Sequence, residues 1–356
     1  MHSAISTGSL ALVVSFAMLF VLRPLADKVQ LVDRPTQRKK HTGAVPLIGG
    51  LSAFAGLLVA WLVSMPLSDG FGIYLLCSLL LVFLGALDDA RDIPAKFRLW
   101  AQMTLGAFLA YGSGVYLTGF GNLLGFGDIS LGWAGPAVTV AAVIGATNAY
   151  NMMDGIDGLA GSMSLVTFGA LAVLFSQAAG FSIQYALALT IMMALVPYMA
   201  ANLSVPLFRT KIFMGDAGSM FIGFSGVWLL VNGAQPEGGA FRPVTALWIC
   251  AVPLMDMVAI MVRRARKGQS VMIPDRDHLH HILMRAGCSD RQALIVITLL
   301  AVICAGIGIG GEILLIPEWF MFGLFMAVFF AYSWALRHVW GFVVFFRRKS
   351  ATASQN

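Results

Sequence analysis

The chain has 356 residues, of which 59% are hydrophobic and only 11% carry a formal charge. A soluble protein of this length needs far more charge to cover its surface, so the composition excludes one. The formal net charge is +6, and the mean hydropathy is +0.83. Windows of about 20 apolar residues, the length that spans a bilayer as a helix, recur along most of the chain. The sequence therefore predicts an all-α polytopic integral membrane protein.

Eleven apolar windows predict about 11 transmembrane helices. They fall at residues 3–22, 44–65, 71–87, 99–118, 131–150, 158–179, 181–203, 217–233, 243–262, 292–311 and 316–340. The sixth and seventh windows form a tight hairpin that turns at Gly180. No polar stretch is long enough to fold alone. We therefore expect one transmembrane domain over residues 1–346, followed by a basic, disordered tail over residues 347–356.

Basic residues fall almost entirely in the loops that follow odd-numbered windows. Of 23 lysines and arginines, only Arg242 lies on the other side. Because basic loops remain in the cytoplasm, we expect a periplasmic N-terminus and a cytoplasmic C-terminus. Most aspartates lie in the same loops, which places the candidate chemistry on the cytoplasmic face.

The first acidic motif, LDDARD, ends the third window with Asp88, Asp89 and Asp92. Asp88 and Asp92 share a helix face, where like charges repel unless a cation or a proton lies between them. Arg98 follows shortly after and is placed to hold a phosphate. The alternative interpretation of this motif is a solvated helix end that carries charge.

The second motif, NAYNMMDGIDGL, joins the fifth and sixth windows and carries Asn151, Asp154 and Asp157. Its glycines, Gly155 and Gly158, let the backbone turn and approach a ligand. The order of residues is not that of an EF-hand loop. A turn in which Asn and Asp cap the two helix ends is the alternative, but the polar side chains exceed what two caps need.

The third motif, FMGDAGS, opens the eighth window at Asp216. A helix N-terminus with small residues binds anions through its free N–H groups and its dipole. The alternative is that Asp216 only caps its own helix.

The fourth motif, HLHH, lies in a long basic loop and follows Arg276 with His278, His280 and His281. Zinc is one interpretation, but the loop offers no complete tetrahedral ligand set. Imidazole and guanidinium groups that bind a phosphate or a sugar explain the motif better. Surface histidines are a credible alternative for His281 alone.

Together, LDDARD, NAYNMMDGIDGL, FMGDAGS and HLHH resemble the motifs of the polyprenyl-phosphate N-acetylhexosamine-1-phosphate transferases, a superfamily of membrane glycosyltransferases. The segments VTALWICAVPLMDMVAIMVRRARKGQS and HHILMRAGCSDRQA are similar to the branch that uses UDP-GlcNAc and undecaprenyl phosphate. The resemblance runs almost end to end. It implies the transfer of GlcNAc-1-phosphate from UDP-GlcNAc to undecaprenyl phosphate, with release of UMP.

The resemblance also implies roles for the motif residues. Asp216 and the amide oxygen of Asn151 would hold Mg²⁺, with Mn²⁺ as an alternative. Asp88 would act as base or orient the lipid phosphate, and Asp89 and Asp92 complete the catalytic set. The substrate-binding residues would be Asp154, Asp157 (reading the uracil), Arg98, Arg276, His278 and His280.

The expected setting is the bacterial inner membrane, with a multi-pass chain whose product initiates surface polysaccharides of the O-antigen or enterobacterial common antigen type. The partners are UDP-GlcNAc, undecaprenyl phosphate and membrane lipid, with no nucleic acid, and a homodimer is left open. Three alternatives remain: another UDP-N-acetylhexosamine as donor, a transporter of nucleotides or lipid phosphates, and an intramembrane prenyltransferase. Release of UMP distinguishes the transferase from the last two.

Overall fold

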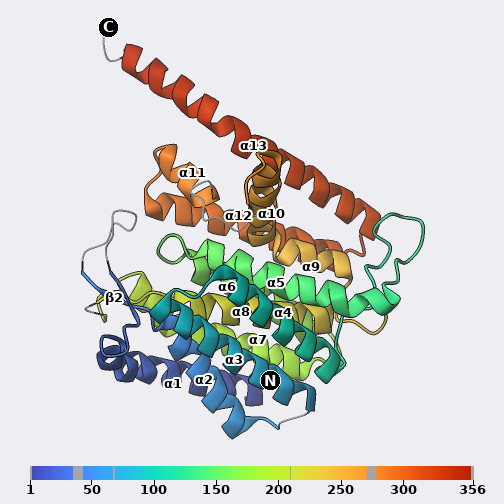
Figure 1. Ribbon diagram of the computed structural model, residues 1–356. Coiled ribbons are helices and arrows are strands. Elements are labelled where there is room, and N and C mark those ends of the chain that lie inside the picture. The colour runs from blue at the N-terminus through green and yellow to red at the C-terminus, as the bar shows by residue number, and fades with distance from the viewer. Residues whose placement is uncertain (1, 35–42, 67–68, 209, 271–277, 354–356) are drawn as a thin grey trace.

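The computed structural model describes residues 2–34, 43–66, 69–208, 210–270 and 278–353, and in these ranges its regular structure is almost entirely helical (Figure 1). A two-stranded antiparallel sheet pairs Val32 with Pro46 and Asp33 with Val45. The elements are α1 (His2–Ala26), β1 (Val32–Asp33), β2 (Val45–Pro46), α2 (Gly49–Ser64), α3 (Asp69–Arg91), α4 (Ala95–Ser113), the 3₁₀ turn η1 (Gly132–Ala134), α5 (Gly135–Met153), α6 (Leu159–Gln177), α7 (Ser182–Asn202), α8 (Gly215–Gly233), α9 (Pro243–Ile249), α10 (Ala251–Arg266), α11 (Leu279–Arg285), α12 (Asp290–Ile313) and α13 (Glu318–Ala353).

Each of the eleven apolar windows contains a helix, and the ninth contains the bent pair α9 and α10. In the described part of the chain, six helices are long and apolar enough to cross a membrane, or seven if the bent pair is one span. The protein is thus an all-α membrane protein, as the composition predicts. The expected turn at Gly180 is also confirmed, because this glycine has a φ of 87° between α6 and α7.

Helix α8 lies at the centre of the bundle and is buried along nearly its whole length. It packs against α2, α3 and α5 through glycines that let the backbones approach. Gly50 of α2 meets Gly218, and Gly85 of α3 meets the backbone of Ala217. A Cβ on Gly223 would lie 2.7 Å from the carbonyl oxygen of Ala146 in α5. These contacts hold the first turn of α8 beside the ends of α3 and α5.

The chain bends by 81° between α9 and α10. Pro253 follows the break and has no N–H to bond the carbonyl of Ile249, the last residue of α9. Helix α10 therefore runs steeply across the bundle towards α13, which lies on the opposite side of the molecule from α1 (Figure 1). Helix α13 continues to Ala353, through much of the segment 347–356 expected as a tail.

At the end of the bundle remote from the start of α8, Arg242 forms a dense network. Its backbone N–H and its Nε donate to Glu312, whose carboxylate also accepts from the Thr245 hydroxyl at 2.6 Å. The two Nη atoms of Arg242 donate to the carbonyls of Gly311 and Ile316 at 2.8 and 2.7 Å. This network ties the start of α9 to the end of α12.

Candidate active site

The turn between α3 and α4 places Asp88 and Arg98 against each other. Asp88 is buried, its Oδ1 accepts from the backbone N–H of Ile93 at 2.7 Å, and its Oδ2 forms an ion pair with Arg98 Nη1. Asp92 ends α3 in the left-handed conformation with a φ of 51°, as short polar residues do at helix ends. Its side chain is exposed.

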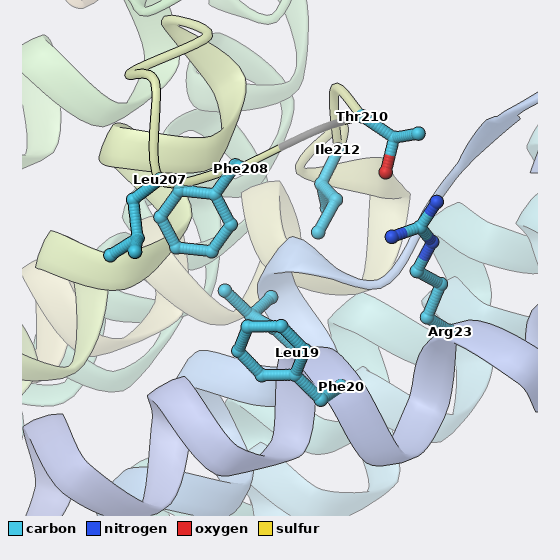
Figure 2. Close-up of a pocket in the computed structure, with 7 residues that line it drawn as sticks. All are labelled: Leu19, Phe20, Arg23, Leu207, Phe208, Thr210 and Ile212. Atoms are coloured by element: carbon cyan, nitrogen blue, oxygen red, sulfur yellow. The ribbon is translucent and has the colours of Figure 1, made fainter.

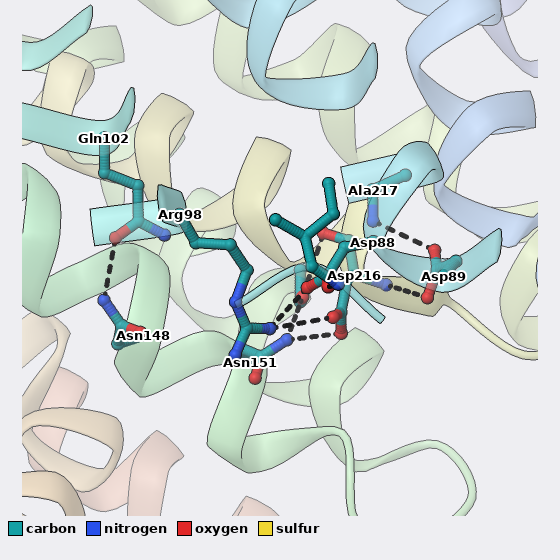
Figure 3. A network of polar contacts seen from close by, with 10 residues as sticks. Asp88, Asp89, Arg98, Gln102, Asn148, Asn151, Asp216 and Ala217 are labelled. Atoms are coloured by element: carbon teal, nitrogen blue, oxygen red, sulfur yellow. Dashed lines mark hydrogen bonds and ion pairs between the residues drawn. The ribbon is translucent and has the colours of Figure 1, made fainter. Parts of the chain in front are cut away.

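Asp89, near the end of the neighbouring helix α3, caps helix α8 (Figure 3). Its two carboxylate oxygens accept from the backbone N–H groups of Asp216 at 2.9 Å and Ala217 at 3.3 Å. The first N–H groups of a helix have no partner within it, and a negative charge there is favourable to the helix dipole. The cap therefore comes from Asp89 and not from Asp216, whose side chain remains free to face the site.

The side chain of Asp216 connects α8 to Asn151 of α5 and to Arg98 of α4 (Figure 3). Its Oδ1 accepts from Asn151 Nδ2 at 2.6 Å, and its Oδ2 lies 3.3 Å from Arg98 Nη1. The same Arg98 nitrogen also contacts Asp88, so carboxylates from α3 and α8 both bind the Arg98 guanidinium group. We call Asp88, Asp89, Arg98, Asn151 and Asp216 the α3–α8 cluster.

The α3–α8 cluster offers the donor set of a hard divalent cation. Asp88 and Asp216 direct carboxylate oxygens at one point, which Arg98 now neutralises. No group of three or more His, Cys, Asp or Glu side chains is arranged around a metal position in the described part of the chain. Two carboxylates are nevertheless enough for Mg²⁺, which usually keeps several waters and binds substrate phosphates. Asn151 turns its amide nitrogen towards Asp216, so its role as an oxygen ligand stays a prediction.

The loop between α5 and α6 brings two more carboxylates to the cluster. Asp157 forms an ion pair with Lys211, the first residue of the segment KIFMGD. Asp154 is exposed at the surface, but desolvation by the neighbouring protein, together with the negative charges of Asp89 and Asp157, raises its pKa to about 7. A site that already holds this much negative charge favours a bound cation.

Residues 278–281, which we call the histidine loop, form the start of α11 and meet the α5–α6 loop. His278 Nδ1 lies 2.8 Å from Asp256 Oδ2, and its ring is parallel to that of His280 at 5.8 Å between centroids. His280 is 1% exposed and packs directly against Gly155. Burial lowers the pKa of the His280 imidazole to about 3, so this ring is neutral at physiological pH. The structure therefore supports a packing role for the His280 ring. A contact between His280 and substrate stays a prediction.

Four partners of the motif residues were not predicted from the sequence to be site residues. Lys211 pairs with Asp157, Gln102 accepts from Asn148 Nδ2 at 3.0 Å, and Ser219 lies 3.1 Å from Asn151 Nδ2. Asp256 was visible as a carboxylate inside an apolar window, a placement that usually signals a function. Of the predicted site residues, Arg276 lies outside the described ranges.

A separate cavity of about 160 Å³ lies between the end of α1 and the segment that follows α7 (Figure 2). Apolar side chains of Leu19, Phe20, Leu207, Phe208 and Ile212 line it, with Arg23 and Thr210 at its polar side. None of the α3–α8 cluster contributes to this lining, so the cavity is distinct from the candidate site.

Comparisons with known proteins show the family to which the chain is similar. Residues 71–234 match the family model described as glycosyl transferase family 4, a range that runs from α3 to α8 and includes the whole α3–α8 cluster. The chain is 46% identical to the undecaprenyl-phosphate alpha-N-acetylglucosaminyl 1-phosphate transferase of Yersinia pestis, over 96% of this chain and 94% of that protein. The proteins of the same name from Escherichia coli (strain K12) and Haemophilus influenzae are 42% and 41% identical, covering 95% and 96% of this chain and 92% and 96% of theirs.

Proposed function

The chain belongs to glycosyl transferase family 4, and from this membership we propose that it transfers GlcNAc-1-phosphate from UDP-GlcNAc to undecaprenyl phosphate, releasing UMP. It is a phosphoglycosyltransferase embedded in a membrane. The observation that carries the proposal is the convergence of Asp88 and Asp216 on Arg98 at the start of α8. A reaction between a phosphate anion and a diphosphate needs such a place, where cations and carboxylates are held together.

In the proposed reaction, an oxygen of the lipid phosphate forms a bond to the phosphorus that carries the sugar. The anhydride bond to the uridine-linked phosphate breaks, and UMP leaves with the electron pair. Because all the reacting groups are anionic, the main task of the protein is to position them and to neutralise charge. Arg98 supplies a positive charge at the cluster, and His278 and Lys211 place further donors around it.

Asp216 and Asp88 would hold Mg²⁺, or Mn²⁺ in its place, which when bound neutralises the diphosphate charge as a Lewis acid. Asn151 orients Asp216 by donating to its Oδ1, and Asp89 fixes the backbone of Asp216 by capping α8. Arg98 contacts both carboxylates, so a cation held by Asp88 and Asp216 would share them with its guanidinium group. The site thus contains its own cation, which offsets the charge of these carboxylates.

Direct attack by the lipid phosphate is favoured over a two-step route through an aspartyl-phosphosugar. The nucleophile is already an anion and needs positioning more than activation. Asp89 is a poor candidate for a covalent nucleophile, because both of its carboxylate oxygens accept backbone N–H groups of α8. Asp88 is likewise engaged by Ile93 and Arg98.

Several finer features belong to the same proposal. They are about 11 membrane crossings, a periplasmic N-terminus, a cytoplasmic C-terminus, the bacterial inner membrane and an active site that faces the cytoplasm. The sidedness of the lysines and arginines supports them. The product would start a surface polysaccharide of the O-antigen type. A homodimer stays a prediction.

The deciding experiment combines the purified protein, undecaprenyl phosphate and a panel of UDP-sugars, and measures UMP release with and without EDTA. We expect release with UDP-GlcNAc, and its loss when EDTA removes the metal. Asp216→Asn should lower the rate about 100-fold or more, as the loss of one electrostatic contact to a transition state does. Asp128→Asn neutralises an exposed carboxylate outside the site and serves as the matched control.

Each result of this assay has one meaning. Turnover with another UDP-N-acetylhexosamine but not with UDP-GlcNAc would revise the donor. Absence of UMP with every sugar would overturn the transferase in favour of a transporter or a prenyltransferase. Near-normal turnover of Asp216→Asn in Mg²⁺ would contradict the metal assignment.

A further inference from the structure

A buried aspartate, Asp256 of α10, lies at the junction of three helices. It is 0% exposed, and its carboxylate accepts from three donors. Oδ1 accepts from the Leu279 backbone N–H at 3.0 Å and from the Tyr332 hydroxyl at 2.7 Å, and Oδ2 lies 2.8 Å from His278 Nδ1. A buried carboxylate is costly unless such partners satisfy it. Asp256 thus joins α10 to the start of α11 and to α13.

The contact with His278 has a chemical consequence for the imidazole. An ionised carboxylate can only accept a hydrogen bond, so beside an ionised Asp256 the His278 ring carries its proton on Nδ1. The second nitrogen, Nε2, is then the one left to meet a ligand. If the ring gains a second proton, the positive charge is balanced by Asp256 and Nε2 becomes a donor suited to a phosphate oxygen. Asp256 therefore sets both the tautomer and the orientation of this ring.

The position of His278 connects Asp256 to the candidate site. Its ring lies parallel to His280, which packs against Gly155 beside Asp154. Resting on the proposed function, we propose that Asp256 is a positioning residue that holds His278 by Nδ1 so that Nε2 binds the diphosphate of the sugar nucleotide. No part of the reaction passes through Asp256 itself, because its carboxylate is fully enclosed.

A simpler role for Asp256 is structural: its hydrogen bonds would only hold α10, α11 and α13 together, a role that we call a staple. Two of its three hydrogen bonds, from Leu279 and Tyr332, fit that role equally well. The two roles differ in what happens when His278 is absent. A positioning residue loses its effect on catalysis without the side chain that it positions, whereas a staple keeps its effect.

The kinetic test uses a double-mutant cycle of Asp256→Asn and His278→Ala. Asparagine is nearly isosteric, and its amide group donates to Nδ1, which forces the opposite tautomer as in the corresponding change of a serine protease triad. We expect Asp256→Asn to lower kcat/KM for the sugar nucleotide by about 10–100-fold, the usual effect of losing a partner that orients a ligand-binding histidine. In the His278→Ala background, the same change should alter kcat/KM less than about twofold.

Tyr332→Phe is the matched control, because it removes a different hydrogen bond from the same carboxylate. We expect this variant to lower the melting temperature while leaving His278 in place, with a much smaller effect on kcat/KM than that of Asp256→Asn. Equal losses of activity in Tyr332→Phe and Asp256→Asn, or losses that add in the double mutant, would overturn the positioning role.

A spectroscopic measurement tests the arrangement even if the proposed reaction is wrong. Protein labelled with ¹⁵N-histidine reports which ring nitrogen carries the proton at about pH 8, where an ordinary imidazole is neutral. The signal of His278 is assigned by its loss in His278→Ala. We expect a protonated Nδ1 in the wild type and a protonated Nε2 in Asp256→Asn. An unprotonated Nδ1 in the wild type would overturn the inference, whatever substrate the protein uses.

Discussion

At the scale of single residues, three of the motif carboxylates have partners of different kinds. Asp88 binds Arg98, Asp89 binds backbone amides, and Asp157 binds Lys211. Like charges so close together would otherwise repel, so these partners stabilise the folded protein. A ligand therefore competes with internal cations, and its net gain in free energy is smaller than the contacts alone suggest.

The identities of these carboxylates could be read from sequence motifs, but their partners could not. The cap of α8 shows the reason. Local spacing favours Asp216 as the cap of its own helix, whereas the structure uses Asp89, which is 127 residues away from Asp216. Pairing at that distance depends on how α3 packs against α8, and no local pattern encodes it.

Gly155→Ala tests the contact between the histidine loop and the α5–α6 loop. A Cβ at this position would collide with the His280 ring, which is buried and has little room to move. We expect at least a tenfold loss of UMP release, since displacements of about 1 Å at an active site cost up to about 100-fold. Gly145→Ala is the control, because its Cβ would meet only the flexible end of Met257 at 3.6 Å. Full activity of Gly155→Ala would show that His280 has no role in arranging the site.

At the scale of helices, α8 owes its central place to glycines. Its contacts with α2, α3 and α5 bring backbones close together, so van der Waals packing replaces the hydrophobic effect that lipid cannot supply between helices. The apolar windows predicted the positions of the helices, because burial and lipid both select apolar side chains. They could not predict the 81° bend between α9 and α10, which lies inside one continuous window.

Gly223→Ala and Gly226→Ala compare two sites on the same helix. A Cβ at position 223 would lie 2.7 Å from backbone atoms of Ala146 and Thr147, whereas a Cβ at position 226 has nothing within 4 Å. We expect the first change to destabilise the protein by about 1–3 kcal/mol, as overpacking does. The second should stabilise it by about 0.5–1 kcal/mol, because alanine loses less backbone entropy than glycine in a helix. Melting temperatures in detergent measure both, and equal shifts would contradict the proposed packing of α8 on α5.

At the scale of the whole molecule, the two ends of the bundle differ in charge. The end that begins α8 holds the α3–α8 cluster, Lys211 and the histidine loop. The other end holds Arg242 in a closed network with Glu312 and Thr245. Exchange of substrates is therefore expected at one end only, while the network at the other end holds α9 and α12 together.

Cysteine labelling in cells tests which end faces the cytoplasm. Glu237→Cys and Lys267→Cys are placed singly in a protein that lacks the four native cysteines, at two exposed positions in opposite loops. We expect a membrane-impermeant maleimide to label position 237 in spheroplasts and position 267 only after the membrane is permeabilised, because basic loops remain in the cytoplasm. The reverse pattern would invert the proposed orientation.

The cap that Asp89 provides for α8 also concerns how the protein is made. Synthesis starts at the N-terminus, so α3 is finished more than a hundred residues before the amides of Asp216 and Ala217 exist. During that interval Asp88 and Asp89 have no contact with α8, because α8 has not yet been synthesised. The α3–α8 cluster can therefore form only late in biogenesis, when α8 docks against α3. A nascent chain released earlier would carry the first aspartate motif without Asp216.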